Sequence, residues 1–270
     1  MSEDQIHFYF EGDDYYRDLW RELEMARESI RIEVYKIDPD PIGFKLKDIL
    51  VHQAQRGVRV QVICDALGSH SLPKTYIDEL KEVGIAVKIY HPFRWLKFFH
   101  LSINRRNHRK MVIIDSKVGF IGGMNFSAVH SQELSGLTRW RDTQARFTGK
   151  MVDKMVYFFK RSVREIKHRS FRMERFASEN DVVSTQIYLG RNHIRRFFHR
   201  YIRRSHHLIV ISTAYFVPDV LTTYLLVRAV KRGVRVIVLT NIDVSDVPAV
   251  RRVNRPILQY LAHHGVEVYS

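Results

Sequence analysis

An internal repeat constrains the fold of this chain more than any other feature of its sequence. The segment RGVRV occurs twice, starting at Arg56 and at Arg232, which are 176 residues apart. Ser29 and Ser205, which open the apolar segment before each copy, are also 176 residues apart. Self-similarity that is kept in this order predicts two copies of one folding unit. We place the two copies at residues 1–175 and 176–270.

Strand-like and helix-like segments alternate within the first copy. Apolar alternation predicts strands at residues 29–35, 58–65 and 85–90, and helical spacing predicts helices at residues 13–28, 42–56 and 73–83. Strands separated by helices of this length predict an α/β domain with a mixed, largely parallel sheet. The chain has 270 residues, 45% of them apolar, which is enough to form the cores of two such units.

The segment NHRKMVIIDSKVGFIGGMNF carries the residues with the clearest chemistry. It has the pattern H-x-K-x4-D-x6-G-G-x-N, formed by His108, Lys110, Asp115, Gly122, Gly123 and Asn125. The apolar residues between the lysine and the aspartate predict a buried strand, and the period of two places the histidine and the lysine on the same face of it. The sequence therefore predicts a nucleophile or base beside a cation.

Imidazole, ammonium and amide groups that meet at one place suit a phosphate ester. Lys110 and Asn125 would hold the phosphoryl oxygens, Gly123 would let the backbone approach them, and His108 would attack phosphorus or move a proton. The simpler alternative is a satisfied strand histidine next to a lysine that reaches solvent. Six positions at fixed spacing favour the functional interpretation.

The motif and its surroundings resemble a known family. The pattern is similar to the HKD signature of the phospholipase D superfamily, while NRRNHRK, FIGGMNFSAVH and WRDTQARFTG resemble bacterial cardiolipin synthases of the branch without an N-terminal membrane anchor. The resemblance runs from about Ile6 to Ser270. It implies a phospholipase D-like α-β-α layered domain, followed by an incomplete second copy without its own HKD motif.

The resemblance also implies a reaction that needs no metal and no cofactor. His108 would form a phosphohistidine intermediate, and a phosphatidyl group would pass to the glycerol of phosphatidylglycerol to give cardiolipin, with either phosphatidylglycerol or phosphatidylethanolamine as its donor. Asp142 would support the imidazole from its far nitrogen, although an ordinary strand-edge aspartate is an alternative. Asp115 would either contact the substrate or brace its strand, and we favour bracing.

A second motif is expected beyond the residues given. His108 follows Gly84 by 24 residues, and the same spacing after Gly265 reaches about residue 289. The chain through Ser270 thus holds one half-site, which we expect to be weak or inactive by itself. The complete protein would be a monomer with a pseudo-two-fold repeat, and a dimer is expected only if Ser270 is the native end. We hypothesise that Ser270 is not the native terminus of a working enzyme.

The charge and one aromatic segment predict an anionic partner. The formal net charge is +15, which suits either a lipid headgroup surface or nucleic acid. Between the third strand and the motif, aromatic and basic side chains alternate in a form suited to membrane contact: Arg94, Trp95, Lys97, Phe98, Phe99, Arg105 and Arg106. The resemblance favours anionic phospholipid over nucleic acid, at the cytoplasmic face of a bacterial membrane. A nuclease of the same superfamily and a non-enzymatic lipid-binding fragment remain the alternatives.

Overall fold

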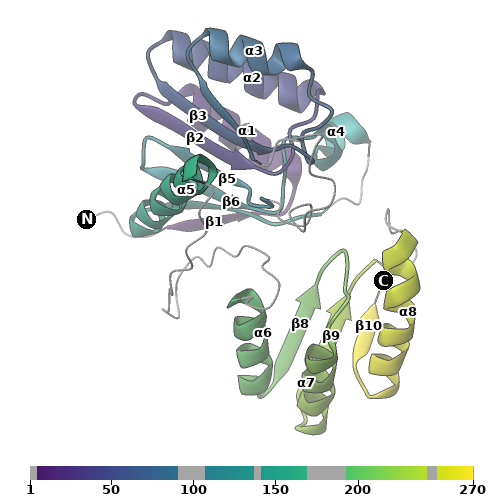
Figure 1. Cartoon of the computed structure of the whole chain (residues 1–270). Coiled ribbons are helices and arrows are strands. Elements are labelled where there is room, and N and C mark those ends of the chain that lie inside the picture. The colour runs from purple at the N-terminus through teal and green to yellow at the C-terminus, as the bar shows by residue number, and fades with distance from the viewer. Residues whose placement is uncertain (1–4, 91–106, 137–140, 169–192, 242–247, 270) are drawn as a thin grey trace. The chain divides into compact units, whose positions relative to one another are not determined.

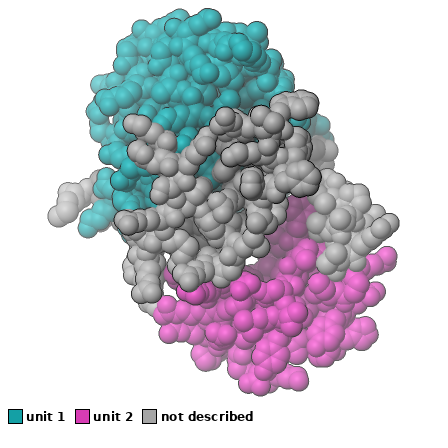
Figure 2. Space-filling view, in the orientation of Figure 1, with its two compact units in different colours: residues 1–188 teal, residues 189–270 magenta. Residues whose placement is uncertain are grey.

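The computed structural model describes residues 5–90, 107–136, 141–168, 193–241 and 248–269. The chain forms two compact units, Met1–Tyr188 and Leu189–Ser270 (Figure 2). The boundary that we expected after residue 175 falls within residues 169–192, outside the described residues. In the ranges described, no helix combines the length and the apolar character needed to cross a bilayer.

The first unit alternates strands and helices and then adds a strand hairpin. Its elements are β1 (Ile6–Tyr9), α1 (Gly12–Glu24), β2 (Ser29–Val34), α2 (Pro41–Gln55), β3 (Arg59–Asp65), α3 (Lys74–Glu82), β4 (Ala86–Tyr90), β5 (Met111–Ile114), β6 (Val118–Gly122), the 3-10 helix η2 (Ala128–His130), α4 (Gln132–Ser135), β7 (Gln144–Thr148) and α5 (Lys150–His168). The helix predicted over residues 13–28 ends at Glu24. It ends early because the backbone N–H groups of Arg27 and Glu28 bind the Asp115 carboxylate.

The seven strands form one mixed sheet with the order β1-β7-β6-β5-β2-β3-β4. The helix-connected strands β2, β3 and β4 run parallel to one another. The remaining pairs, which join β2, β5, β6, β7 and β1, are antiparallel. The mixed α/β fold predicted from the alternation is confirmed, and its antiparallel part comes from the hairpin that carries the motif.

Helices cover both faces of this sheet (Figure 1). Helices α1, α2 and α3 pack on one face through a core that includes Leu19, Leu46 and Val62. Helix α5 packs on the other face through Met155 and Phe159, which contact the strand residues of a smaller core. Both faces of β5 are thus buried, as its run of four apolar residues predicts.

The second unit repeats the helix and strand order of the first. Its elements are α6 (His193–Arg204), β8 (Leu208–Ser212), α7 (Val220–Lys231), β9 (Arg235–Leu239), α8 (Pro248–His263) and β10 (Glu267–Tyr269). Its three strands are all parallel, with the order β10-β9-β8. One face of this sheet is buried against the helices, and the other exposes Leu208, Val210 and Leu239.

The strand register corrects one detail of the repeat. In the first unit Arg59 pairs with Ser29, whereas Arg235, its equivalent 176 residues later, pairs with Leu208. Ser205 is therefore not the equivalent of Ser29, and the sequence alignment at this strand was wrong by three residues. The difference lies in the helix that follows, because α2 has 15 residues and α7 has 12.

Candidate active site

His108 and Lys110 lie just before strand β5 and not within it. The strand begins at Met111, so the prediction that both residues occupy one face of a strand is wrong. The Lys110 ammonium instead turns back and donates a hydrogen bond to the carbonyl oxygen of His108 at 3.0 Å. His108 is partly exposed, while Lys110 keeps 5% of its surface accessible. The His108 carbonyl therefore holds the cation close to the residue that carries the imidazole.

The sheet topology explains why distant residues meet at this end. Strands β2 and β3 are parallel, and β5 is antiparallel to β2, so the start of β5 lies beside the ends of β2 and β3. By the same reasoning the end of β6 and the start of β7 lie at this edge too. The edge thus gathers His108 and Lys110 from the segment before β5, Gly123 from the end of β6 and Asp142 from the start of β7.

Tyr35, which follows β2, packs against both motif side chains. Its ring centroid lies 4.7 Å from that of His108, and the Lys110 ammonium lies 5.4 Å from the centre of the Tyr35 ring. An aromatic face attracts a cation at this distance and limits the rotation of a neighbouring ring. Tyr35 therefore fixes both groups, a role that the sequence analysis did not assign to it.

Burial controls the protonation of both motif side chains. Burial lowers the pKa of His108 below its usual value of 6.5, and the Lys110 charge lowers it further, while Asp65 acts in the opposite direction. Burial also lowers the pKa of Lys110 to about 8, with the Asp142 carboxylate opposing the change. At neutral pH the site accordingly pairs a neutral imidazole with a protonated amine.

The two glycines at the end of β6 allow a close backbone approach. A Cβ atom on Gly122 would overlap the Thr143 carbonyl and the Gln144 side chain, and a Cβ atom on Gly123 would overlap the Asp142 carboxylate. The Gly123 N–H donates to the Thr143 carbonyl at 3.0 Å. Glycine is thus required at both positions so that the start of β7 can bring Asp142 into the site.

Asn125 is held on three sides by hydrogen bonds. Its Oδ1 accepts from the Lys36 N–H at 3.2 Å, and its carbonyl accepts from the Tyr16 hydroxyl at 2.7 Å. Its N–H donates to His130 Nε2 at 3.2 Å. The hydrogen bond to Oδ1 fixes the orientation of the amide, and the Nδ2 group is the end of the side chain that can donate to an anionic oxygen.

His130 is a second histidine that the sequence analysis did not single out. It is buried, and burial together with the charges of Lys110 and Lys36 lowers its pKa to about 4. A neutral imidazole can accept the hydrogen bond from the Asn125 N–H, whereas an imidazolium cannot. In sequence, the only signal for His130 was its place five residues after Asn125.

The expected carboxylate support is divided between two aspartates. The Asp142 carboxylate accepts from the Thr143 N–H at 2.7 Å, and its charge acts on Lys110. The aspartate whose charge acts on His108 is Asp65, which is fully buried at the end of β3 and accepts from the Asn107 N–H at 3.0 Å. Asp65 thus joins the site, and its position at the end of a buried strand was the signal that could have found it.

A buried acidic residue organises the chain just before the motif. Glu33 is fully buried in β2 and accepts hydrogen bonds from Asn107 Nδ2 at 2.6 Å and from Arg109 Nη1 at 3.0 Å. Arg109 Nη1 also donates to Ser162 Oγ on α5 at 2.8 Å. These contacts tie the residues on both sides of His108 to the sheet and to α5.

Asp115 lies at the opposite end of β5 from Lys110. Its carboxylate accepts from the backbone N–H groups of Arg27, Glu28 and Ser29 at 2.8–2.9 Å. Five residues of extended chain separate it from Lys110 by about 16 Å. This geometry supports the bracing role and gives no support to a contact between Asp115 and the substrate.

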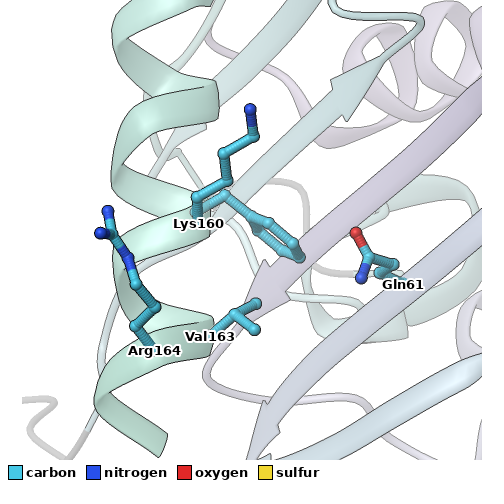
Figure 3. A pocket seen from close by; sticks show the side chains of 5 residues that line it. Gln61, Lys160, Val163 and Arg164 are labelled. Atoms are coloured by element: carbon cyan, nitrogen blue, oxygen red, sulfur yellow. The ribbon is translucent and has the colours of Figure 1, made fainter. Parts of the chain in front are cut away.

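The structure also has an open cleft that no motif residue lines (Figure 3). Its volume is about 470 Å³, and it lies between α5 and β3, lined by Gln61, Phe159, Lys160, Val163 and Arg164. Figure 3 shows Val163 and Gln61 on its two sides. The expected membrane-contact residues Arg94, Trp95, Lys97, Phe98, Phe99, Arg105 and Arg106 lie outside the described residues.

Comparison with known proteins agrees with the resemblance seen in the motif. Residues 19–134 match the family described as "Cardiolipin synthase, PLD-like domain". Cardiolipin synthase B of Escherichia coli (strain K12) is 30% identical over 269 residues, which cover 96% of this chain and 65% of that protein. The cardiolipin synthase of Geobacillus sp. (strain WCH70) is 29% identical and is covered to 53%. This chain therefore spans between half and two thirds of the length of these relatives.

A solved structure shares the fold. The phosphatidylserine synthase of Haemophilus influenzae Rd KW20 superposes with a TM-score of 0.68 and covers 96% of this chain, with 68% of its own length matched. The two sequences are 13% identical over this match. At that identity the likeness shows the fold alone.

Proposed function

Because the chain carries a phospholipase D-like domain of the cardiolipin synthase family, we propose that it transfers a phosphatidyl group between lipid alcohols. The observation that carries the proposal is the pairing of a neutral, exposed His108 with a buried, protonated Lys110. A neutral imidazole offers a lone pair to phosphorus, and the adjacent cation stabilises the negative charge that develops on the phosphoryl oxygens.

In the first step a nitrogen of His108 bonds to phosphorus, and the bond from phosphorus to the leaving alcohol oxygen breaks. Lys110 and Asn125 Nδ2 hold the non-bridging oxygens, and Gly123 leaves room for them. The leaving oxygen takes its proton from a second acid, which we assign to the histidine of a second motif of the same kind. In the second step the acceptor hydroxyl oxygen bonds to phosphorus, the phosphorus–nitrogen bond to His108 breaks, and the hydroxyl proton passes to the same second acid–base group, which restores both histidines.

We assign the substrates to the anionic phospholipids, with phosphatidylglycerol as donor and acceptor and cardiolipin as product. The names of the relatives support this choice, since two of them are cardiolipin synthases. The formal net charge of +15 also favours an anionic surface. We place the protein at the cytoplasmic face of a bacterial membrane, in peripheral contact with it.

The first half of the reaction can be tested on this chain. Incubation with short-chain phosphatidylglycerol in EDTA, followed by mass spectrometry of peptides, should find a phosphatidyl adduct on the peptide that contains His108. His108→Ala should remove the adduct, while His70→Ala, a change at an exposed histidine, should retain it. An adduct that persists in His108→Ala would contradict the proposal, and so would the absence of any adduct when a chain with an intact second motif is also present.

A nuclease of the same superfamily is the second candidate, and the net charge is the observation that favours it. It requires cleavage of DNA in EDTA that depends on His108. DNA cleavage of this kind without any lipid adduct would replace the first proposal with the second.

A further inference from the structure

Two helices of the second unit lie side by side and share an outer surface. Arg195 Nη1 pairs with Asp219 at 3.0 Å where both helices begin, and His199 Nε2 lies 2.8 Å from Thr222 Oγ1. Where the helices end, Arg232 donates to the Ile202 carbonyl at 2.9 Å. Contacts at both ends mean that α6 and α7 run in the same direction, with their buried residues turned to the sheet.

The exposed side chains of these helices are basic and aromatic. We call them the α6–α7 face, which comprises Arg196, Arg200, Tyr201, Arg203, Val220, Tyr224, Arg228 and Lys231, all exposed. The two helices together contain seven basic residues and no acidic residue. The equivalent helices of the first unit, α1 and α2, contain four basic and six acidic residues. The shared fold therefore does not require this charge, and another cause must account for it.

Apolar surface is interleaved with the cations. Tyr201 is 56% exposed and stacks on Phe197, with ring centroids 6.5 Å apart. Tyr224 is 55% exposed, and the Arg228 guanidinium lies over its ring at 6.0 Å. Val220, one turn before Tyr224, is 88% exposed. Burying these two tyrosines and this valine in an apolar layer would be favourable.

We propose that the α6–α7 face docks on the surface of a bilayer that contains anionic phospholipid. Arginine forms paired hydrogen bonds with phosphate, and tyrosine rings are suited to the depth of the headgroups. Both helices lie along the surface of the second unit, so they can contact the headgroup plane along their length. The inference rests on the proposed function for its lipid substrate and names a surface of the second unit that would hold the chain on a membrane containing that lipid.

Lipid is favoured over nucleic acid by the apolar part of the face. Either partner can satisfy the arginines, because both present phosphate groups. Val220 gains contact from acyl chains, whereas a sugar–phosphate backbone offers it little apolar surface. The exposed valine thus distinguishes the two partners, whereas the two tyrosines suit both, because bases also stack on aromatic rings.

The test compares charge reversals on two equivalent helical layers of the full chain. Arg196→Glu with Arg203→Glu changes the α6–α7 face, and Lys45→Glu with Lys81→Glu makes the same change at exposed positions on α2 and α3. Binding is measured by co-sedimentation with phosphatidylcholine vesicles that contain phosphatidylglycerol. Removing two surface cations should weaken binding by roughly 30-fold, and reversal should weaken it further. The control pair should lose less than about threefold, and circular dichroism should show that both variants are folded.

The outcomes separate this inference from the proposed function. Equal losses in both pairs, or no loss in the α6–α7 pair, would overturn the docking surface even where His108 forms its adduct with short-chain lipid. A selective loss of vesicle binding would support the surface even where no adduct forms. Tighter binding of a single-stranded oligonucleotide than of vesicles, lost in the same variant, would assign the face to nucleic acid instead. A Val220→Ser variant should weaken vesicle binding and leave oligonucleotide binding unchanged.

Discussion

Replacing Lys110 by methionine should stabilise the first unit while it removes the proposed function. The Lys110 amine is almost fully buried, and its pKa falls from 10.5 to about 8. At about 1.4 kcal/mol per pKa unit, the protonated amine costs the folded state about 3 kcal/mol below pH 8. Loss of the hydrogen bond to the His108 carbonyl offsets about 1 kcal/mol of this gain. We expect a net stabilisation of about 2 kcal/mol at pH 7.

The pH dependence of this gain follows from the direction of the pKa change. Between pH 8 and 10.5 the unfolded state holds a proton on Lys110 that the folded state has released, so the stability of the unmodified chain rises with pH. The cost of the charge is complete below pH 8 and falls to about 1.4 kcal/mol at pH 9.5. Lys110→Met should therefore stabilise the unit by about 2 kcal/mol less at pH 9.5 than at pH 7.

Urea unfolding followed by tryptophan fluorescence can measure this difference. The three tryptophans of the sequence all lie in residues 1–188, so the signal reports on the first unit. Lys81→Met, a change at an exposed lysine of the same unit, serves as the control and should stay within about 0.5 kcal/mol at both pH values. If Lys110→Met raises the free energy of unfolding equally at pH 7 and pH 9.5, the conclusion that the buried charge of Lys110 destabilises the folded state is refuted.

Three further results are expected. Asp115→Ala should destabilise the first unit by about 2–3 kcal/mol, because three backbone N–H groups lose their acceptor. The same hydrogen bonds lower the pKa of Asp115, so the stabilisation by its carboxylate should be lost as the pH falls through this lowered pKa. Acid unfolding of the unmodified chain and of Asp115→Ala would measure this loss. Gly123→Ala should abolish adduct formation and lower the free energy of unfolding by about 1–3 kcal/mol, because its Cβ would overlap the Asp142 carboxylate. Retained activity together with unchanged stability in urea would count against this geometry. The rate of adduct formation should fall below the lowered pKa of His108 and above pH 8, where Lys110 loses its proton, and Lys110→Arg should move the alkaline fall upward if any activity remains.

The roles of several site residues could be predicted because local sequence carries them. His108 and Lys110 were recognised from their spacing, and the glycines from the backbone freedom that a close approach needs. Asp142 was assigned to His108, but its charge acts on Lys110 and the charge that acts on His108 belongs to Asp65. Its support of the imidazole stays a prediction. Spacing along a chain cannot decide which of two carboxylates reaches a given atom after folding.

The sequence by itself determined the layered α/β fold and the positions of β2, β3 and β4. Apolar alternation and helical spacing are local properties of the sequence, so they can be recognised without knowledge of any tertiary contact. The repeat was equally clear, apart from a three-residue register error at β8 that only the strand pairing with β9 revealed.

Only the tertiary structure decided which groups surround the motif. Tyr35, Asp65 and His130 lie up to 95 residues apart in the sequence, and they surround the motif because five strands begin or end at one edge of the sheet. Burial at that edge, which no local pattern measures, lowers the pKa of Lys110 and of His108. The motif identifies the candidate reacting groups, but their protonation states and the residues that position them depend on the folded sheet.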